Sequence, residues 1–126
     1  MQNCEIEHVN ISVSNVHETA KMLEFLFGWQ IRWQGAGQLN GYTIHIGTQS
    51  QYIAIWQKHD TDGEPAKFEK GAPLNHIGIK VSNLDEIEAK VRQYGLEPFN
   101  FASYNPGRRF YFFDRDNIEY EILSYE

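Results

Sequence analysis

The sequence has a single cysteine, Cys4, so one chain cannot form a disulfide with itself. This scarcity is typical of proteins in a reducing compartment. The first residues, "MQNCE", have neither the basic start nor the apolar stretch of a signal peptide. No apolar run approaches the roughly 20 residues that cross a bilayer. We therefore expect a cytoplasmic protein without a membrane span, and no motif surrounds Cys4 to make it a nucleophile.

Basic residues are also few and scattered. Eleven Lys and Arg stand against 17 Asp and Glu, which gives a net charge of −6, and Arg108-Arg109 is the only adjacent basic pair. Without a basic stripe to neutralise phosphates, a nucleic-acid partner is not expected. The chain does have 41% hydrophobic residues, among them 8 Phe, 7 Tyr and 3 Trp. At 126 residues it fits one domain, or two small halves that share a core.

The two halves of the chain resemble each other. Residues 6–18 read "IEHVNISVSNVHE" and residues 74–86 read "LNHIGIKVSNLDE", a constant shift of 68 that places His8 on His76. Each half also finishes on an apolar stretch, "YIAIW" in the first and "YEILS" in the second, whose tyrosines are 68 apart. Agreement across several segments predicts two copies of one structural unit.

Hydrophobic period and turn residues assign the elements of each unit. Strands are expected at residues 5–13, 30–35, 41–47 and 51–57, and again at 75–81, 97–101, 108–113 and 118–124. Helices are expected near 16–27 and 84–94, each after a Ser-Asn N-cap and each before a glycine. Their buried stripes would be Ala20, Leu23 and Phe27 in one helix and Leu84, Ile87 and Val91 in the other.

These elements predict an α+β protein built from two βαβββ modules. The modules cover residues 1–57 and 74–126, and the polar segment 58–73, rich in Gly and Pro, reads as a linker. One such module has an apolar sheet face without a partner. We therefore expect both to combine into a single domain over residues 1–126.

The last strand carries two carboxylates on one face. Glu119 and Glu121 alternate with the apolar Ile118, Tyr120 and Ile122. The preceding Asp-Arg-Asp-Asn segment is a turn, in which asparagine adopts the left-handed conformation. The acids serve solubility if their face meets solvent, and chemistry if it lines a cavity.

Together, "HVNISVSNV", "NHIGIKVSNLDE" and "FFDRDNIEYEIL" resemble the vicinal oxygen chelate superfamily. That superfamily includes glyoxalase I, fosfomycin-resistance proteins, extradiol dioxygenases, methylmalonyl-CoA epimerase and metal-free bleomycin-resistance proteins. The chain departs from its Asp-Pro-Asp-Gly turn, where Arg and Asn replace Pro and Gly. The resemblance implies modules that curl a half-open mixed sheet around a cavity, usually in a homodimer.

The resemblance also implies metal ligands on the first and last strands of the modules. Carried over, these are His8, His76 and Glu121, around a divalent Zn, Ni, Fe or Mn ion.

The fourth ligand position is a departure from the family pattern. It falls on Ile53 by the 68-residue shift, or on Ala54 after a slip of one residue, and neither side chain binds metals. Gln51 and Gln57, on the Ile53 face, carry the nearest amide oxygens.

These features predict a metal-dependent, glyoxalase-like enzyme of the lyase or isomerase type, acting on a small metabolite with adjacent oxygens. Glu121 would be a ligand, and Glu119 a supporting carboxylate or the base. Two alternatives stay open: a metal-free, bleomycin-resistance-like binding protein and a small non-heme iron dioxygenase.

Aromatic and basic side chains complete the predicted site. The candidate substrate contacts are Trp56, Tyr104 and either Arg108 or Arg109, since neighbours on a strand point to opposite faces. Of the three remaining histidines, His17 and His45 are expected at the surface or at the mouth of the cavity, and His59 in solvent in the linker.

Overall fold

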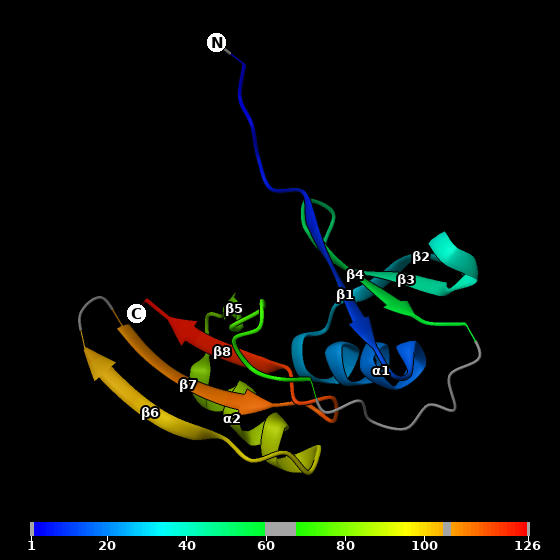
Figure 1. The fold of residues 1–126 in the computed structure, drawn as a ribbon. Helices are drawn as coiled ribbons and strands as arrows, with labels where there is room; N and C mark the ends of the chain where they lie inside the picture. The colour runs from blue at the N-terminus through cyan, green and yellow to red at the C-terminus, as the bar shows by residue number, and fades with distance from the viewer. Residues whose placement is uncertain (1, 60–67, 105–106, 126) are drawn as a thin grey trace. The chain divides into compact units, whose positions relative to one another are not determined.

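The chain folds into two compact units, Met1–Pro65 and Ala66–Glu126, which we call module 1 and module 2 (Figure 1). The computed structural model describes residues 2–59, 68–104 and 107–125. The boundary falls within the expected linker 58–73, whose residues 60–67 lie outside the described residues. Within the described ranges, no helix has the length and apolar character needed to cross a membrane.

Module 1 is a four-stranded sheet with one helix. Its elements are β1 (His8–Val13), α1 (Val16–Phe27), β2 (Gln30–Ala36), the 3₁₀ turn η1 (Gln38–Asn40), β3 (Tyr42–Gly47) and β4 (Tyr52–Gln57). The strand order is β1-β4-β3-β2. β1 runs parallel to β4, and the other pairs are antiparallel.

Module 2 repeats this plan. Its elements are β5 (Ile77–Lys80), α2 (Leu84–Gln93), β6 (Phe99–Tyr104), β7 (Gly107–Phe113) and β8 (Glu119–Ser124), in the sheet order β5-β8-β7-β6. β5 is again parallel to the last strand. The predicted α+β class with two βαβββ modules is therefore confirmed.

Both helices begin and end as their sequences predict. The Asn15 side chain accepts hydrogen bonds from the backbone N–H groups of His17 and Glu18, at 3.0 and 3.1 Å. Asn83 accepts one from Glu86 at 3.0 Å. These caps satisfy amides that have no partner inside the helix. Gly28 follows α1 with a φ of 68°, the left-handed conformation that glycine adopts without strain.

Each helix covers one face of its own sheet and buries the core there. In module 1 the most buried side chains are Leu23, Leu26, Ile44, Ile46 and Ile55. In module 2 they are Val91, Phe110, Phe112, Tyr120 and Ile122. The predicted stripe is correct except at Phe27, which is half-buried and turns its ring to Trp29 at 5.0 Å, so Leu26 takes the core position.

The strand boundaries differ most in β6, expected at 97–101 and found at Phe99–Tyr104. Asn100 has a φ of 56° and the pairing register shifts between Phe99 and Ala102, so a bulge interrupts the strand. The turn η1 was not expected from the sequence. The strands predicted at 5–13 and 75–81 are shorter, His8–Val13 and Ile77–Lys80.

Candidate functional site

In each module one sheet face lies against the helix, and we call the opposite one the open face. Alternation along β8 places Glu119 and Glu121 on the open face of module 2, while Tyr120 and Ile122 lie under α2. The turn before β8 forms as predicted, with Asn117 at a φ of 66°. Both predicted acids therefore share a face, and both are at least 90% buried.

Glu121 is held by three side chains of module 2. Its Oε1 lies 3.1 Å from Nε2 of His76. Its Oε2 accepts hydrogen bonds from Nη1 of Arg109 at 2.8 Å and from the hydroxyl of Tyr111 at 3.1 Å. The two carboxylate oxygens thus have different roles, because one faces an imidazole and the other is occupied by cationic and phenolic donors.

The sheet register creates this arrangement. Tyr111 stands directly opposite Glu121 on β7, and Gly78 stands opposite it on β5. A Cβ built on Gly78 would lie 3.7 Å from Oε1, so the carboxylate has a bare backbone on that side. Burial and then the charge of Glu121 raise the pKa of Tyr111. Burial is the largest single influence on the pKa of Arg109 and lowers it, but the hydrogen bond to Glu121 together with the charges of Tyr104, Glu121 and Tyr111 raises the pKa overall.

The two adjacent arginines separate as strand geometry requires. Arg109 lies on the open face with its guanidinium carbon 4.6 Å from the ring centre of Tyr104. Arg108 points to the helix side, where Nη2 donates to Oδ1 of Asp85 on α2 at 2.9 Å. Of the two candidates for a substrate contact, only Arg109 shares a face with Glu121.

Glu119 has a partner that the sequence did not suggest. Its carboxylate forms an ion pair with the ammonium group of Lys70, from the segment before β5. Glu119 is 5% exposed. Each of the two open-face acids therefore has its own cation, and neither is an isolated buried charge.

The open face of module 1 carries rings instead of acids. His8 on β1 and His45 on β3 flank Tyr52 on β4, with ring centres 4.8 and 4.7 Å from the tyrosine. The guanidinium carbon of Arg32 lies 4.3 Å from the Tyr52 ring centre. We call His8, Tyr52 and His45 the ring column. Burial, and then the neighbouring His8 and Arg32, lower the pKa of His45.

The other aromatic candidate, Trp56, also lies on the open face of module 1. Its neighbour across the sheet is Ser12 of β1. Its indole N–H donates to the carbonyl of Gln38 in η1 at 2.9 Å, which fixes the ring. The unexpected 3₁₀ turn thus positions one of the predicted residues.

The pairing registers correct the interpretation of the fourth ligand position. Val9 pairs with Ile53 in module 1, and its counterpart Ile77 pairs with Tyr120 in module 2. Glu121 therefore corresponds to Ala54, and the 68-residue shift that matched Ile53 is wrong by one residue in the last strand. For the same reason Tyr120 does not correspond to Tyr52.

Neither glutamine replaces that ligand. Oε1 of Gln57 accepts a hydrogen bond from the backbone N–H of Val16 at 2.9 Å, on the helix side of the sheet. Gln51 lies in the turn before β4, where its backbone N–H donates to Oγ1 of Thr48 at 3.2 Å. Both have local structural roles.

The donors of module 2 fit two positions of a metal site. Ligand bonds of about 2.1 Å at a right angle place two donor atoms about 3.0 Å apart. The 3.1 Å between Nε2 of His76 and Oε1 of Glu121 matches that spacing. Among the described residues of either module, however, no group of three His, Cys, Asp or Glu could hold an ion. Module 2 thus supplies two donors.

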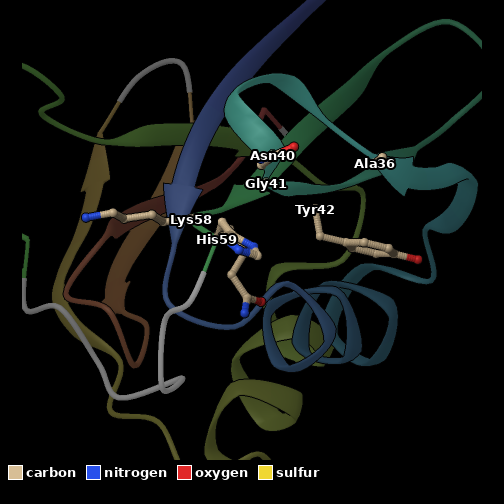
Figure 2. Close-up of a pocket in the computed structure, with 7 residues that line it drawn as sticks. Ala36, Asn40, Gly41, Tyr42, Lys58 and His59 are labelled. Carbon is tan, nitrogen blue, oxygen red and sulfur yellow. The ribbon is translucent and has the colours of Figure 1, made fainter.

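A separate open depression of about 410 Å³ lies in module 1 (Figure 2). Lys58 and His59, which follow β4, line it together with Tyr42 of β3, and in Figure 2 the Lys58 side chain points away from Tyr42. None of the predicted catalytic, metal or substrate residues lines it; its lining is Ala36, Asn40, Gly41, Tyr42, Gln57, Lys58 and His59.

Residues 7–112 match the family described as the glyoxalase/bleomycin resistance protein/dioxygenase superfamily. The chain belongs to this superfamily. The predicted resemblance to the vicinal oxygen chelate proteins is confirmed. No curated protein sequence matches the chain.

Solved structures share the fold of this superfamily member. A glyoxylase/bleomycin resistance protein/dioxygenase domain from Frankia sp. EAN1pec has a TM-score of 0.83 at 18% identity, over 99% of this chain and 94% of that chain. The fosfomycin resistance protein FosX from Listeria monocytogenes, solved with Mn(II) and sulfate, has a TM-score of 0.76 at 18% identity, over 98% of this chain and 93% of that chain. FosX from Mesorhizobium loti has a TM-score of 0.73 at 22% identity, over 96% of this chain and 91% of that chain.

Sequence reasoning missed several residues of the candidate site. Tyr111 follows Arg109 by two positions, so strand alternation predicts that both share a face, and the register then places Tyr111 opposite Glu121. Lys70 gave no such signal, because it reaches Glu119 from a segment without regular structure. His45 was expected at the surface or at the cavity mouth and was given no role, whereas the structure places it, half-buried, in the ring column.

Proposed function

We propose that this superfamily member is a metal-dependent, glyoxalase-like enzyme for a small molecule with two adjacent oxygens. His8, His76 and Glu121 would hold a divalent Zn, Ni, Fe or Mn ion. The observation that carries the proposal is the 3.1 Å between Nε2 of His76 and Oε1 of Glu121 on the open face of module 2. His8 joins the set because the repeat makes it the counterpart of His76.

The Mn(II) complexes of FosX, which share the fold, support a divalent ion in this scaffold. Such an ion supplies Lewis acidity that stabilises negative charge on the substrate oxygens. The homodimer expected from the resemblance remains part of the proposal.

The protein's own residues would prepare the site for that chemistry. Arg109 and Tyr111 hold Oε2 of Glu121, which orients Oε1 toward His76. Glu119, two positions along the same face, is the candidate to move a proton, and Lys70 fixes it until the substrate arrives. Arg109 over Tyr104 would contact an anionic part of the substrate.

A metal-free binding protein is the second candidate. It is favoured by Ala54, which stands where a second carboxylate ligand would be, and by Oε2 of Glu121, which Arg109 and Tyr111 already occupy. In that case the ring column of module 1 would stack on a ring-bearing ligand.

The metal content of purified protein distinguishes the two candidates. We expect about one ion per chain in the wild type, by elemental analysis, and loss of the ion in Glu121→Ala and His76→Ala. Glu86→Ala is the matched control, because this exposed acid on α2 pairs only loosely with Lys90, at 3.7 Å. It should keep the ion.

Absence of any ion after incubation with iron, manganese, nickel and zinc would overturn the enzyme proposal and favour the binding protein. A stoichiometric ion in His76→Ala would show that the ligand set is wrong. Oxygen uptake by the iron-loaded protein with catechols would assign the reaction to a dioxygenase.

A further inference from the structure

The residue before each proposed ligand histidine contacts that histidine's Nδ1. A carboxylate oxygen of Glu7 bonds to Nδ1 of His8. The amide oxygen Oδ1 of Asn75 lies 2.7 Å from Nδ1 of His76. Glu7 and Asn75 occupy the same place in the 68-residue repeat, although one is an acid and the other an amide. The contact is thus repeated with two different acceptors.

An acceptor at Nδ1 decides where a neutral imidazole keeps its proton. The proton stays on Nδ1, and the lone pair is then on Nε2. We propose that Glu7 and Asn75 are positioning residues that hold His8 and His76 with Nε2 as the ligating nitrogen. The inference rests on the proposed function only in assigning that nitrogen to a metal.

Each of the two histidine rings also contacts a tyrosine, besides the acceptor at its Nδ1. The Tyr52 ring stacks on His8, and its hydroxyl shares the Glu7 carboxylate. In module 2 the edge of Tyr111 meets His76 at 5.9 Å and 87°.

In module 2 the contact to Asn75 orients the His76 ring so that Nε2 faces Glu121. With the proton of His76 on Nδ1, its Nε2 and Oε1 of Glu121 are two acceptors 3.1 Å apart. Two facing acceptors repel unless a cation lies between them. A proton on Nε2 would satisfy the same contact, so the Asn75 acceptor favours a metal ion between Nε2 and Oε1 only while it holds the ring proton on Nδ1.

The test uses the full chain with ¹⁵N-labelled histidine and long-range proton–nitrogen NMR, which distinguishes the two ring nitrogens. In metal-free protein we expect His8 with its proton on Nδ1, and a shift toward the Nε2 tautomer in Glu7→Ala. Glu7→Gln keeps an acceptor oxygen and should restore the wild-type tautomer. Glu5→Ala removes an acid two positions away and is the matched control.

The Zn(II)-loaded protein tests both rings. We expect Zn(II) on Nε2 of His76 with the proton on Nδ1, and Zn(II) affinity about 10- to 100-fold weaker in Asn75→Ala. Asn75→Asp should recover most of that affinity. Because Glu7 and His8 are partly solvated, Glu7→Ala should lie near the tenfold end.

Two results would overturn the inference: an unchanged His8 tautomer in Glu7→Ala, or Zn(II) bound through Nδ1. If the wild type binds no Zn(II) while the Glu7 variants shift the His8 tautomer as expected, the positioning role stands and the metal-dependent function fails. The tautomer and the affinity thus separate the two proposals.

Discussion

The two modules have the same strand order and helix position, but their open faces differ in chemistry. Module 2 carries Glu119 and Glu121 with cationic partners, whereas the corresponding positions of β4 in module 1 are Tyr52 and Ala54. Across β7 and β3, Tyr111 corresponds to His45. The open face of module 2 therefore carries the carboxylates, and that of module 1 carries the stacked rings.

The helix faces have changed much less than the open faces. Ile55 and Ile122 are structural counterparts, and both are fully buried under a helix. A helix-facing position must stay apolar because the close-packed core tolerates little change in volume or polarity. The open faces differ in chemistry instead: the buried acids of module 2 have cationic partners, whereas module 1 carries stacked rings.

The largest effect should come from a cavity in the core of either module. Ile55→Ala and Ile122→Ala each leave a cavity under a helix and should cost about 2–5 kcal/mol in free energy of unfolding. Urea denaturation measures both, and we expect similar losses because the positions are equivalent. Ile6→Ala, at a side chain that is 86% exposed, is the control and should change stability by less than about 0.5 kcal/mol. A large loss in one module and a negligible loss in the other would contradict the equivalence.

The next effect is a pH dependence of stability that arises in module 2 and not at the corresponding turn of module 1. Asp114, in the turn before β8, is buried, and this raises its pKa to about 6 from 3.8, although backbone N–H groups of Ile118 and Asp116 partly offset the shift. Its counterpart in module 1 is Thr48, a neutral hydroxyl bonded to the backbone of Gln51. Because the folded state holds the Asp114 proton more tightly, this stabilisation is complete below about pH 4 and is lost as pH rises through about 6.

Asp114→Asn should remove that pH dependence, because the amide resembles the protonated acid. Between pH 4 and pH 7 we expect the stability of the wild type to fall relative to the variant by on the order of 3 kcal/mol. Chemical denaturation at several pH values measures the difference. Thr48→Ala should shift stability equally at all pH values. A constant difference between wild type and Asp114→Asn would show that folding does not raise the pKa of the Asp114 carboxyl group.

Much of the fold could be predicted because it depends on local signals. The caps at Asn15 and Asn83, the left-handed Gly28 and the turn at Asn117 are determined by neighbouring residues. Alternation likewise placed Glu119 and Glu121 on one face. The bulge at Asn100 escaped prediction, because it depends on how β6 pairs with β7 and not on the period of β6 itself.

The sequence predicted several residues of the candidate site, but not the side chains that those residues contact. The family resemblance indicated His76 and Glu121, and Nε2 of His76 lies 3.1 Å from Oε1 of Glu121 in the structure. The 68-residue shift failed in β4 and β8, because the last strand of module 2 is one residue closer to its module's start than in module 1. The sequence repeat aligned two tyrosines that face opposite sides of their sheets, Tyr52 and Tyr120, and register alone reveals this.

The smallest effect tests the backbone beside Glu121. Gly78 corresponds to Asn10 of module 1, which carries a side chain at the same place on the open face. A Cβ on Gly78 would lie 3.7 Å from Oε1 of Glu121 and 3.9 Å from Leu123, both ordinary contacts. Gly78→Ala should therefore stabilise the chain by about 0.4–1 kcal/mol, because alanine restricts the unfolded state more than glycine does.

Thermal unfolding of Gly78→Ala beside Gly28→Ala measures this effect. Gly28→Ala should destabilise the chain, because its φ of +68° strains any residue with a Cβ. A clear loss of stability in Gly78→Ala would mean that the Glu121 carboxylate moves into the space above the β5 backbone. The two modules would then differ because Gly78 leaves room for that motion, and not only because module 2 carries the acid.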